Sequence, residues 1–444
     1  MKFLSDLYKR IKTISSFSDF SHRFLNLFVL LYKICIGHYG EKYWEEQRQN
    51  RKLTKEEVSY INLSRILKNI EYLNSTDQVS KAKKKLKSIE DAIFSFNNKS
   101  LINIFNNELE IADKQTFLKS FPRDVIITLT NKCNLNCIMC FANESKFELN
   151  ERAFEDIKNL IPHLKIVHWM GGEVFLYDKF NILFEEANKY SIKQEIITNG
   201  LLLNKDLIDK IVANNIDVTF SIDGITKDIY EKIRINGKYE KLIENLQYLK
   251  QVREQSKIKP LIKINTVIFK YNYFQIADFM DFCKEYNIDA IEFTPLVRDI
   301  RNKDIDIFTG EIDKDIIKEI EKQLSVAKNK AKEYKILLKN SLPDINFIEK
   351  TKDEYYTFNF KSEDASLCCH IPWKKMFISS NGNIYPNCFC AIPVGNINEI
   401  PLKDIWNGQK MQEYRKRIVD DNIKGFCSED CIYGRISSDS KLFS

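Results

Sequence analysis

Three cysteines stand close together in the stretch Cys133-Asn-Leu-Asn-Cys137-Ile-Met-Cys140. Cysteine thiolates are soft ligands that select zinc, copper or iron–sulfur clusters, and three of them this close can converge on one metal centre. A closed zinc site needs a fourth ligand, and the candidates His163 and His168 lie beyond an expected helix. We therefore favour a cubane cluster with three protein ligands, which leaves one iron free for another molecule.

A second group of cysteines lies in the C-terminal part of the chain, and its members are Cys368, Cys369, Cys388, Cys390, Cys427 and Cys431. A β-hairpin with cysteines near its ends, together with a cysteine pair on a later loop, can supply four thiolates to one site. Zinc and a 4Fe–4S cluster both fit such a site. The chain has 11 cysteines, and in a reducing compartment this number indicates metal binding or redox chemistry rather than disulfides.

The elements that position the first cysteine group are predicted by short β-branched runs that alternate with amphipathic stretches. Such alternation is typical of strand–helix units on a parallel sheet. The expected strands are 125–130, 166–170, 195–198, 218–222, 263–268 and 290–294, and the expected helices between them are 151–160, 179–190, 205–213, 238–254 and 273–286. The sequence thus predicts an α/β fold with a partial, six-stranded TIM-like barrel, whose chemistry belongs at the carboxyl ends of its strands.

The chain is expected to have four parts. A helical N-terminal extension covers residues 1–118, with helices at 55–72 and 79–96, and the barrel covers 119–300. A charged connector with a helix at 313–333 covers 301–365, and a small C-terminal domain with a turn at 379–382 and a helix at 402–418 covers 366–444.

Charge and hydropathy set limits on partners and location. The chain of 444 residues has a net charge of +6, which is too small an excess to indicate a nucleic-acid partner. The start of the chain lacks the pattern of a secretory signal, and the most apolar early stretch, 24–37, is too short to span a bilayer. We expect a cytoplasmic protein without a transmembrane segment.

Further candidate residues follow the next three strands. Gly171 and Gly172 allow a ligand to approach the backbone closely, and the neighbouring Glu173 can accept hydrogen bonds from an ammonium group. Asn199 follows the third strand and Ser221 closes the fourth. Each motif alone fits an ordinary turn, but four motifs at successive strand ends, in order, are far more specific than any one.

The three clustered cysteines, placed after the first strand and followed by these motifs, resemble the cluster motif of the radical S-adenosylmethionine (radical SAM) superfamily. The resemblance implies that Cys133, Cys137 and Cys140 hold a 4Fe–4S cluster that binds SAM. It assigns Gly171, Gly172 and Glu173 to the SAM amino group, Asn199 to the vicinity of the cofactor, Ser221 to the ribose, and Arg234 to the SAM carboxylate. One departure is Met139, where the superfamily often has an aromatic residue.

The C-terminal motifs Cys-x2-Pro-Trp, Asn-Gly-Asn-Ile-Tyr-Pro, Gly-Asn-Ile and Ile-Trp-Asn-Gly resemble the auxiliary-cluster domain called SPASM, or its shorter form, twitch. A full SPASM domain uses about seven cysteines for two clusters, and only six occur here. We therefore expect one auxiliary 4Fe–4S cluster, with the ligands Cys369, Cys388, Cys427 and Cys431. Cys368 in place of Cys369, and Cys390 in place of Cys388, remain open alternatives.

The resemblance also implies a reaction. An external donor such as flavodoxin or ferredoxin reduces the first cluster, SAM is cleaved to methionine and a 5′-deoxyadenosyl radical, and the radical abstracts hydrogen from a substrate C–H bond. The favoured function is an oxidoreductase or maturase that modifies a peptide or protein. The alternatives are a dehydrogenase or epimerase of a small molecule, such as a sugar or aminocyclitol, and a non-catalytic binding protein stapled by zinc.

An epimerase must return a hydrogen atom to its substrate, and a thiol can donate one. Cys283 and Cys390 are the candidate donors. Cys283 lies in an expected amphipathic helix, where a buried structural cysteine is the commoner case.

Overall fold

The computed structural model describes residues 55–140, 146–257, 259–296, 304–308, 313–343, 369–388, 390, 392–420 and 422. The chain divides into two compact units. The first comprises Met1–Ala92, Asn359–Cys369 and Arg417–Ser444, and the second comprises Ile93–Phe358 and His370–Lys416. Of the first unit, the structure describes mainly α3 (Lys55–Ser75) and most of α4 (Val79–Phe96). The loop of Cys133, Cys137 and Cys140 lies in the second unit.

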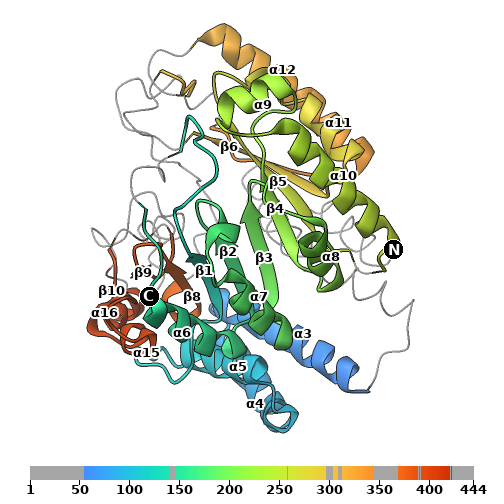
Figure 1. The fold of residues 1–444 in the computed structure, drawn as a ribbon. Helices are drawn as coiled ribbons and strands as arrows, with labels where there is room; N and C mark the ends of the chain where they lie inside the picture. The colour runs from blue at the N-terminus through green and yellow to red at the C-terminus, as the bar shows by residue number, and fades with distance from the viewer. Residues whose placement is uncertain are drawn as a thin grey trace. The chain divides into compact units, whose positions relative to one another are not determined.

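The second unit is built on one ten-stranded sheet with the order β10-β9-β8-β1-β2-β3-β4-β5-β6-β7 (Figure 1). Strands β1 to β7 are parallel neighbours in chain order, β8 pairs in parallel with the other side of β1, and β9 and β10 continue the sheet in antiparallel pairing. The bounds are β1 Asp124–Thr128, β2 Ile166–Met170, β3 Lys193–Thr198, β4 Asp217–Ser221, β5 Ile262–Ile268, β6 Ala290–Pro295, β7 Leu337–Asn340, β8 Lys375–Ile378, β9 Asn383–Tyr385 and β10 Gly395–Asn396.

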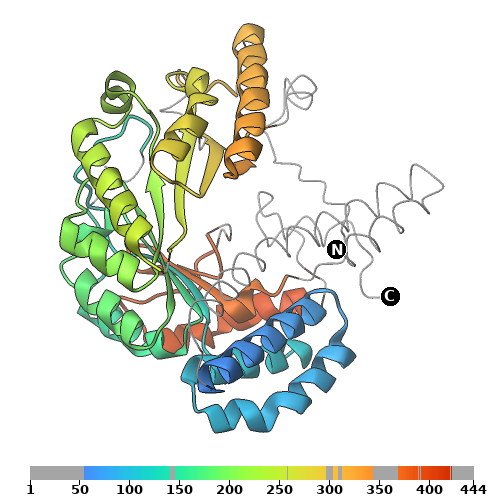
Figure 2. The ribbon, with the colours of Figure 1, turned by 90° about the vertical axis from the view of Figure 1, so that its right-hand side faces the viewer.

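The crossover helices cover one face of this curved sheet (Figure 2). They are α6 Glu151–Leu160, α7 Phe180–Lys189, α8 Lys205–Ala213, α9 Lys227–Ile233, α10 Tyr239–Gln255, α11 Asp278–Glu285 and α12 Lys314–Tyr334. Strand residues alternate accordingly: Val125, Val167 and Trp169 have no exposed surface, whereas Ile126 and His168 are half-buried. The helix-covered face is therefore an apolar core, and the concave face carries partly exposed side chains.

These elements confirm the expected fold class, an α/β partial barrel with helices before it and a small domain after it. The helices expected at 151–160 and 205–213 have these bounds in the structure. The helix expected at 273–286 is a short 3-10 turn at Tyr273–Gln275 followed by α11, and the one expected at 402–418 is split into α15 (Leu402–Trp406) and α16 (Gln409–Val419). α5 (Lys99–Ala112) lies in the N-terminal part that was expected to be helical, although its bounds were not predicted. The sequence did not indicate α9, β7 or β10.

The C-terminal segment packs directly against the residues that precede the barrel. Trp373, in α14 (Ile371–Lys374), donates its indole N–H to the Gln115 carbonyl at 2.7 Å, and Trp406 donates to the Ser120 carbonyl at 2.8 Å. Arg123 and Glu108 form a fully buried ion pair at 2.6 Å. Since β8 also pairs with β1, the segment around α5, the barrel and the C-terminal hairpin share one core within the second unit.

In the described residues, no helix is both long and apolar enough to cross a membrane.

Candidate active site

The loop that carries Cys133, Cys137 and Cys140 begins where β1 ends, and the end of β2 braces one side of it. Gly172 donates its N–H to the Thr130 carbonyl and Glu173 donates to the Lys132 carbonyl, both at 2.8 Å. A Cβ atom on Gly172 would lie only 2.4 Å from the Lys132 carbonyl oxygen. Gly172 is therefore required for the close backbone approach that holds the cysteine loop against β2.

The segment after α9 braces the other side of the loop. Asn136 and Ile138, which flank Cys137, donate their backbone N–H groups to the carbonyls of Ile235 and Ile233 at 2.9 and 3.0 Å. Arg234 lies between the residues that carry these two carbonyl groups. The two main-chain hydrogen bonds therefore bring Cys137 and Arg234 opposite each other. The Arg234 Nη1 lies 3.8 Å from the Cys137 Sγ and donates to it.

Two further donors point at the first sulfur of the loop. The Leu135 backbone N–H donates to the Cys133 Sγ at 3.4 Å, and the Asn199 Nδ2 donates to the same sulfur at 3.9 Å. Burial raises the pKa of the Cys133 thiol, and it raises that of Cys137 to about 11. Burial therefore favours the neutral thiols in the free chain, and binding of a metal centre would stabilise their thiolates.

Glu173 lies beneath the loop and joins the ends of β2 and β3. It is 1% exposed, and burial raises the pKa of its carboxyl group. Its two oxygens accept hydrogen bonds from the Thr198 hydroxyl at 2.7 Å and from the Asn199 backbone N–H at 2.9 Å. A carboxylate has about four acceptor positions, so Glu173 retains capacity for a ligand's ammonium group while it fixes Asn199 beside Cys133.

Ser221 and Arg234 reach the site from β4 and from the end of α9. Ser221 is half-buried on the concave face, opposite Asn265 in the strand register. Arg234 is buried and forms an ion pair with the fully buried Asp223 at 2.6 Å. The structure thus gives Arg234 two protein partners, Asp223 and Cys137. The family resemblance had implied a different partner, the carboxylate of SAM.

This donor set fits an iron–sulfur cluster. It combines soft thiolates, N–H groups aimed at two of the sulfurs, and a Cys140 that is exposed. Within the described residues, no group of three or more His, Cys, Asp and Glu side chains is placed to hold a single metal ion. The candidate zinc ligands have other surroundings: His168 Nδ1 contacts Glu195 at 2.9 Å, and His163 lies before β2, at the opposite end of the strand from the loop.

The second cysteine group is only partly described. Cys388 is exposed and Cys390 is half-buried, and both follow β9. The hairpin that carries them turns at Gly382, where φ is +87°, and side-chain amides hold this turn: Asn396 and Asn398 both donate to the Asn381 carbonyl. Cys369 is described in the other unit, and Cys368, Cys427 and Cys431 lie outside the described residues.

The structure does not bring Cys283 to the cysteine loop. It has no exposed surface within α11, and burial raises the pKa of its thiol. These surroundings are those of a structural cysteine.

Two residues of this site were given no role from the sequence: Asp223, which pairs with Arg234, and Thr198, which donates to Glu173. Asp223 and Thr198 stand inside motifs that the sequence singled out, next to Gly224 and Asn199. Asp223 could have been recognised because it is a charged residue close after a buried strand. A carboxylate that is buried needs a partner of opposite charge or hydrogen-bond donors.

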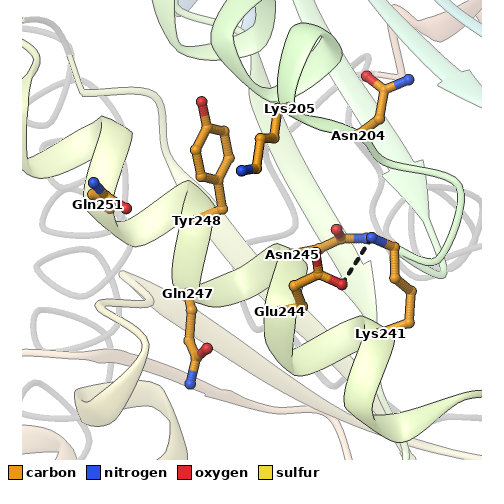
Figure 3. Close-up of a pocket in the computed structure, with 8 residues that line it drawn as sticks. All are labelled: Asn204, Lys205, Lys241, Glu244, Asn245, Gln247, Tyr248 and Gln251. Carbon is orange, nitrogen blue, oxygen red and sulfur yellow. Dashed lines mark hydrogen bonds and ion pairs between the residues drawn. The ribbon is translucent and has the colours of Figure 1, made fainter.

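A separate hollow of about 350 Å³ lies on the outer helices α8 and α10 (Figure 3). Its lining side chains include Lys205, Lys241, Glu244 and Tyr248, and Lys241 and Glu244 form an ion pair at 3.0 Å. These residues belong to the helix layer, so this hollow is not part of the cysteine site.

Residues 127–283 match the radical SAM superfamily, and residues 368–432 match the iron–sulfur cluster-binding domain SPASM. AdoMet-dependent heme synthase of Methanosarcina barkeri is 25% identical over 329 residues, which are 71% of this chain and 90% of that protein. Mycofactocin maturase MftC of Mycobacterium tuberculosis is 26% identical over 164 residues, or 36% of this chain and 41% of that protein.

Among solved structures, SuiB of Streptococcus suis bound to S-adenosylmethionine is similar, with a TM-score of 0.50 and 22% identity over 75% of this chain and 77% of that one. At this identity the likeness supports the fold alone. The two matched domains confirm both resemblances inferred from the cysteine motifs. The chain therefore contains a radical SAM domain, which binds a 4Fe–4S cluster and S-adenosylmethionine, followed by a SPASM domain, which binds auxiliary iron–sulfur clusters.

Proposed function

We propose that this protein is a radical SAM enzyme that removes hydrogen from a C–H bond of a peptide or protein. The observation that carries the radical chemistry is the loop of Cys133, Cys137 and Cys140, which is braced on both sides by main-chain hydrogen bonds and has N–H donors aimed at two of its sulfurs. A 4Fe–4S cluster on this loop, with SAM bound, supplies a 5′-deoxyadenosyl radical.

The residues of the chain hold and orient the cofactor. Gly171 and Gly172 let the cysteine loop pack closely on the end of β2, and Glu173 offers its remaining acceptor positions to the amino group of SAM. Ser221, half-buried at the end of β4, is placed to contact the ribose. Asn199 is fixed by Glu173 and by its own hydrogen bond to Asn134 at 2.9 Å, which keeps its amide at the cluster edge.

The concave face of the sheet supports a chain-like substrate. Partly exposed polar side chains lie on this face in strands β2 to β6, and beside Ser221, which we assign to SAM, they include His168, Glu195, Asn265 and Thr294. A partly polar surface that extends over five neighbouring strands matches an extended peptide better than one compact metabolite. The maturase MftC among the relatives agrees with this assignment.

A second candidate is the oxidation or epimerisation of a small molecule. The heme synthase of Methanosarcina barkeri favours it, because that relative matches over 90% of its own length. In either case the auxiliary cluster, on Cys369, Cys388, Cys427 and Cys431, would accept an electron from the substrate or bind it, with an external flavodoxin or ferredoxin as the donor for the first cluster.

The first experiment is anaerobic reconstitution followed by metal analysis and incubation with dithionite and SAM. We expect about eight iron atoms per chain, four for each of two clusters, and release of 5′-deoxyadenosine. A matched variant with Cys133, Cys137 and Cys140 replaced by alanine should lose half of the iron and all of the product. Zinc in place of iron would indicate the zinc-stapled binding protein and overturn the proposal.

The second experiment addresses the substrate. The enzyme is co-expressed with each short open reading frame next to its gene, and the peptides are analysed by mass spectrometry. A mass change that requires intact Cys137 supports peptide modification. If no peptide changes while a sugar or aminocyclitol transfers deuterium to 5′-deoxyadenosine, the small-molecule function is correct.

A further inference from the structure

The ion pair of Asp223 and Arg234 lies directly behind the middle cysteine of the loop. Asp223 is fully buried and Arg234 is 6% exposed, and the Arg234 Nη2 lies 2.6 Å from the Asp223 Oδ2. The other Asp223 oxygen accepts the Val267 backbone N–H at 2.8 Å, and the Asp223 carbonyl accepts from the Asn272 side chain at 2.9 Å. Strand β5 and the segment after it therefore hold Asp223 in place.

A buried ion pair of this kind is poorly explained by stability alone. Removing two charges from water is costly, and apolar residues of similar size often stabilise a core as well or better. The same buried region contains two polar groups with no protein partner in the described structure, the Arg234 Nε and the Tyr230 hydroxyl. Unsatisfied buried groups of this kind call for a functional explanation.

The geometry indicates what this ion pair does. One amino group of the Arg234 guanidinium is held by Asp223, and the other donates to the Cys137 Sγ at 3.8 Å. The main-chain bridge from residues 136 and 138 to residues 235 and 233 fixes the register of the two side chains. Because the guanidinium is planar and rigid, holding one end of it sets the position of the other.

We propose that Arg234, oriented by Asp223, raises the reduction potential of the first cluster by placing a charged N–H donor on the Cys137 sulfur. Reduction adds one electron to the cluster, and a nearby cation with a hydrogen bond to the sulfur stabilises the added negative charge. Asp223 is a positioning residue that acts through Arg234. This inference rests on the proposed function, since it requires a cluster on Cys133, Cys137 and Cys140.

The test is a potentiometric titration of the reconstituted full-length protein, followed by electron paramagnetic resonance, without SAM. The signal of the auxiliary cluster is recorded separately on the variant that lacks the three loop cysteines and is subtracted. In Arg234→Gln we expect the ratio of reduced to oxidised first cluster, at a fixed potential, to fall about tenfold, which corresponds to about 59 mV for one electron. Arg234→Lys, which keeps the charge without the fork, should shift less in the same direction.

Arg253→Gln is the matched control. Arg253 is also buried and ion-paired, with Asp289, but it lies on α10 away from the cysteine loop. We expect it to leave the midpoint potential unchanged. A fully loaded Arg234→Gln protein with the wild-type potential would overturn the inference, as would a shift seen only when SAM is present, because that result assigns Arg234 to the cofactor carboxylate alone.

If Arg234→Gln fails to load the first cluster, the measurement on Arg234→Lys decides the question, and an unchanged potential there overturns the inference. If neither Arg234 variant binds the first cluster while Arg253→Gln does, Arg234 has a structural role and the inference is overturned. Absence of the first cluster from the wild-type protein would be a different result, and it would overturn the proposed function.

Discussion

The two cysteine regions of the second unit are held in different ways. The loop of Cys133, Cys137 and Cys140 is held by backbone contacts with the ends of neighbouring elements, and buried side chains donate hydrogen bonds to its sulfurs. Cys388, by contrast, is exposed and follows a short hairpin whose turn is held by asparagine side chains. The first region is therefore shaped before a cofactor binds, whereas the described part of the second supplies its thiol from the surface.

The difference indicates distinct tasks. Radical chemistry needs a cluster whose potential and orientation are set by fixed donors, and strand ends of a packed sheet provide them. Where the ligands of an auxiliary cluster come from several loops, binding of the cluster itself contributes more to ordering those loops.

The largest expected effect on iron content and activity comes from disrupting the close contact between Gly172 and the backbone of the cysteine loop. In Gly172→Ala the new Cβ would lie 2.5 Å or less from the carbonyl oxygens of Asn131 and Lys132, so the cysteine loop must move. We expect loss of the first cluster, about half of the iron of the wild-type protein, together with loss of 5′-deoxyadenosine formation. Iron analysis and chromatography of the products measure both.

Gly382→Ala is the counterpart in the second region. Its Cβ would lie 2.4 Å from the Asn396 Oδ1, at a positive φ that disfavours alanine. We expect this variant to lose auxiliary iron and to keep the cleavage of SAM. If Gly382→Ala abolished SAM cleavage while Gly172→Ala did not, the assignment of tasks to the two regions would be wrong.

The next effect distinguishes the cysteines of the hairpin. Cys388→Ala should remove the auxiliary cluster, whereas Cys390→Ala should retain it, because we assign Cys388 as the ligand. Iron content and the resonance signal of the reduced protein measure the outcome. If Cys388→Ala keeps the auxiliary cluster and Cys390→Ala loses it, Cys390 is the ligand in place of Cys388. If Cys390→Ala still cleaves SAM but no longer converts the substrate, Cys390 is supported as a hydrogen donor.

The sequence predicted the scaffold of the first region well. The six barrel strands and most of the crossover helices follow from local hydrophobic periodicity. The spacing of the three cysteines indicated a metal centre, and the family resemblance indicated Gly171, Gly172 and Glu173. Contacts between residues far apart in the chain could not be predicted in this way. Arg234 reaches Cys137 across 97 positions, and β8 lies beside β1 although the two are separated by the whole barrel.

A smaller effect concerns the support behind the second region. Arg415 is fully buried, stacks on Trp406, and donates to the carbonyls of Thr116, Pro372 and Trp406 at 2.7 to 3.0 Å. Arg415→Met leaves these acceptors without a partner, and we expect a loss of about 3 kcal/mol in the free energy of unfolding. The urea midpoint measures this loss. Lys416→Met, an exposed neighbour on the same helix, is the control and should change little.

The smallest effect lies on the concave face, in the same sheet as the first region. Glu195 accepts from the Thr219 hydroxyl at 2.8 Å and contacts His168 and Lys263. Burial alone would raise the pKa of Glu195, but the hydrogen bond from His168 and the charge of Lys263 hold it well below the usual value. A depressed pKa stabilises the folded state above the unfolded-state pKa of about 4.3, and this contribution is lost as the pH falls through the folded-state value. Glu195→Gln should therefore lower the urea midpoint at neutral pH and narrow the difference from wild type as the pH falls below 4.3. Glu240→Gln, at an exposed position, serves as the control.

If the difference in urea midpoint between Glu195→Gln and wild type stayed constant with pH, Glu195 would contribute through packing rather than through its charge.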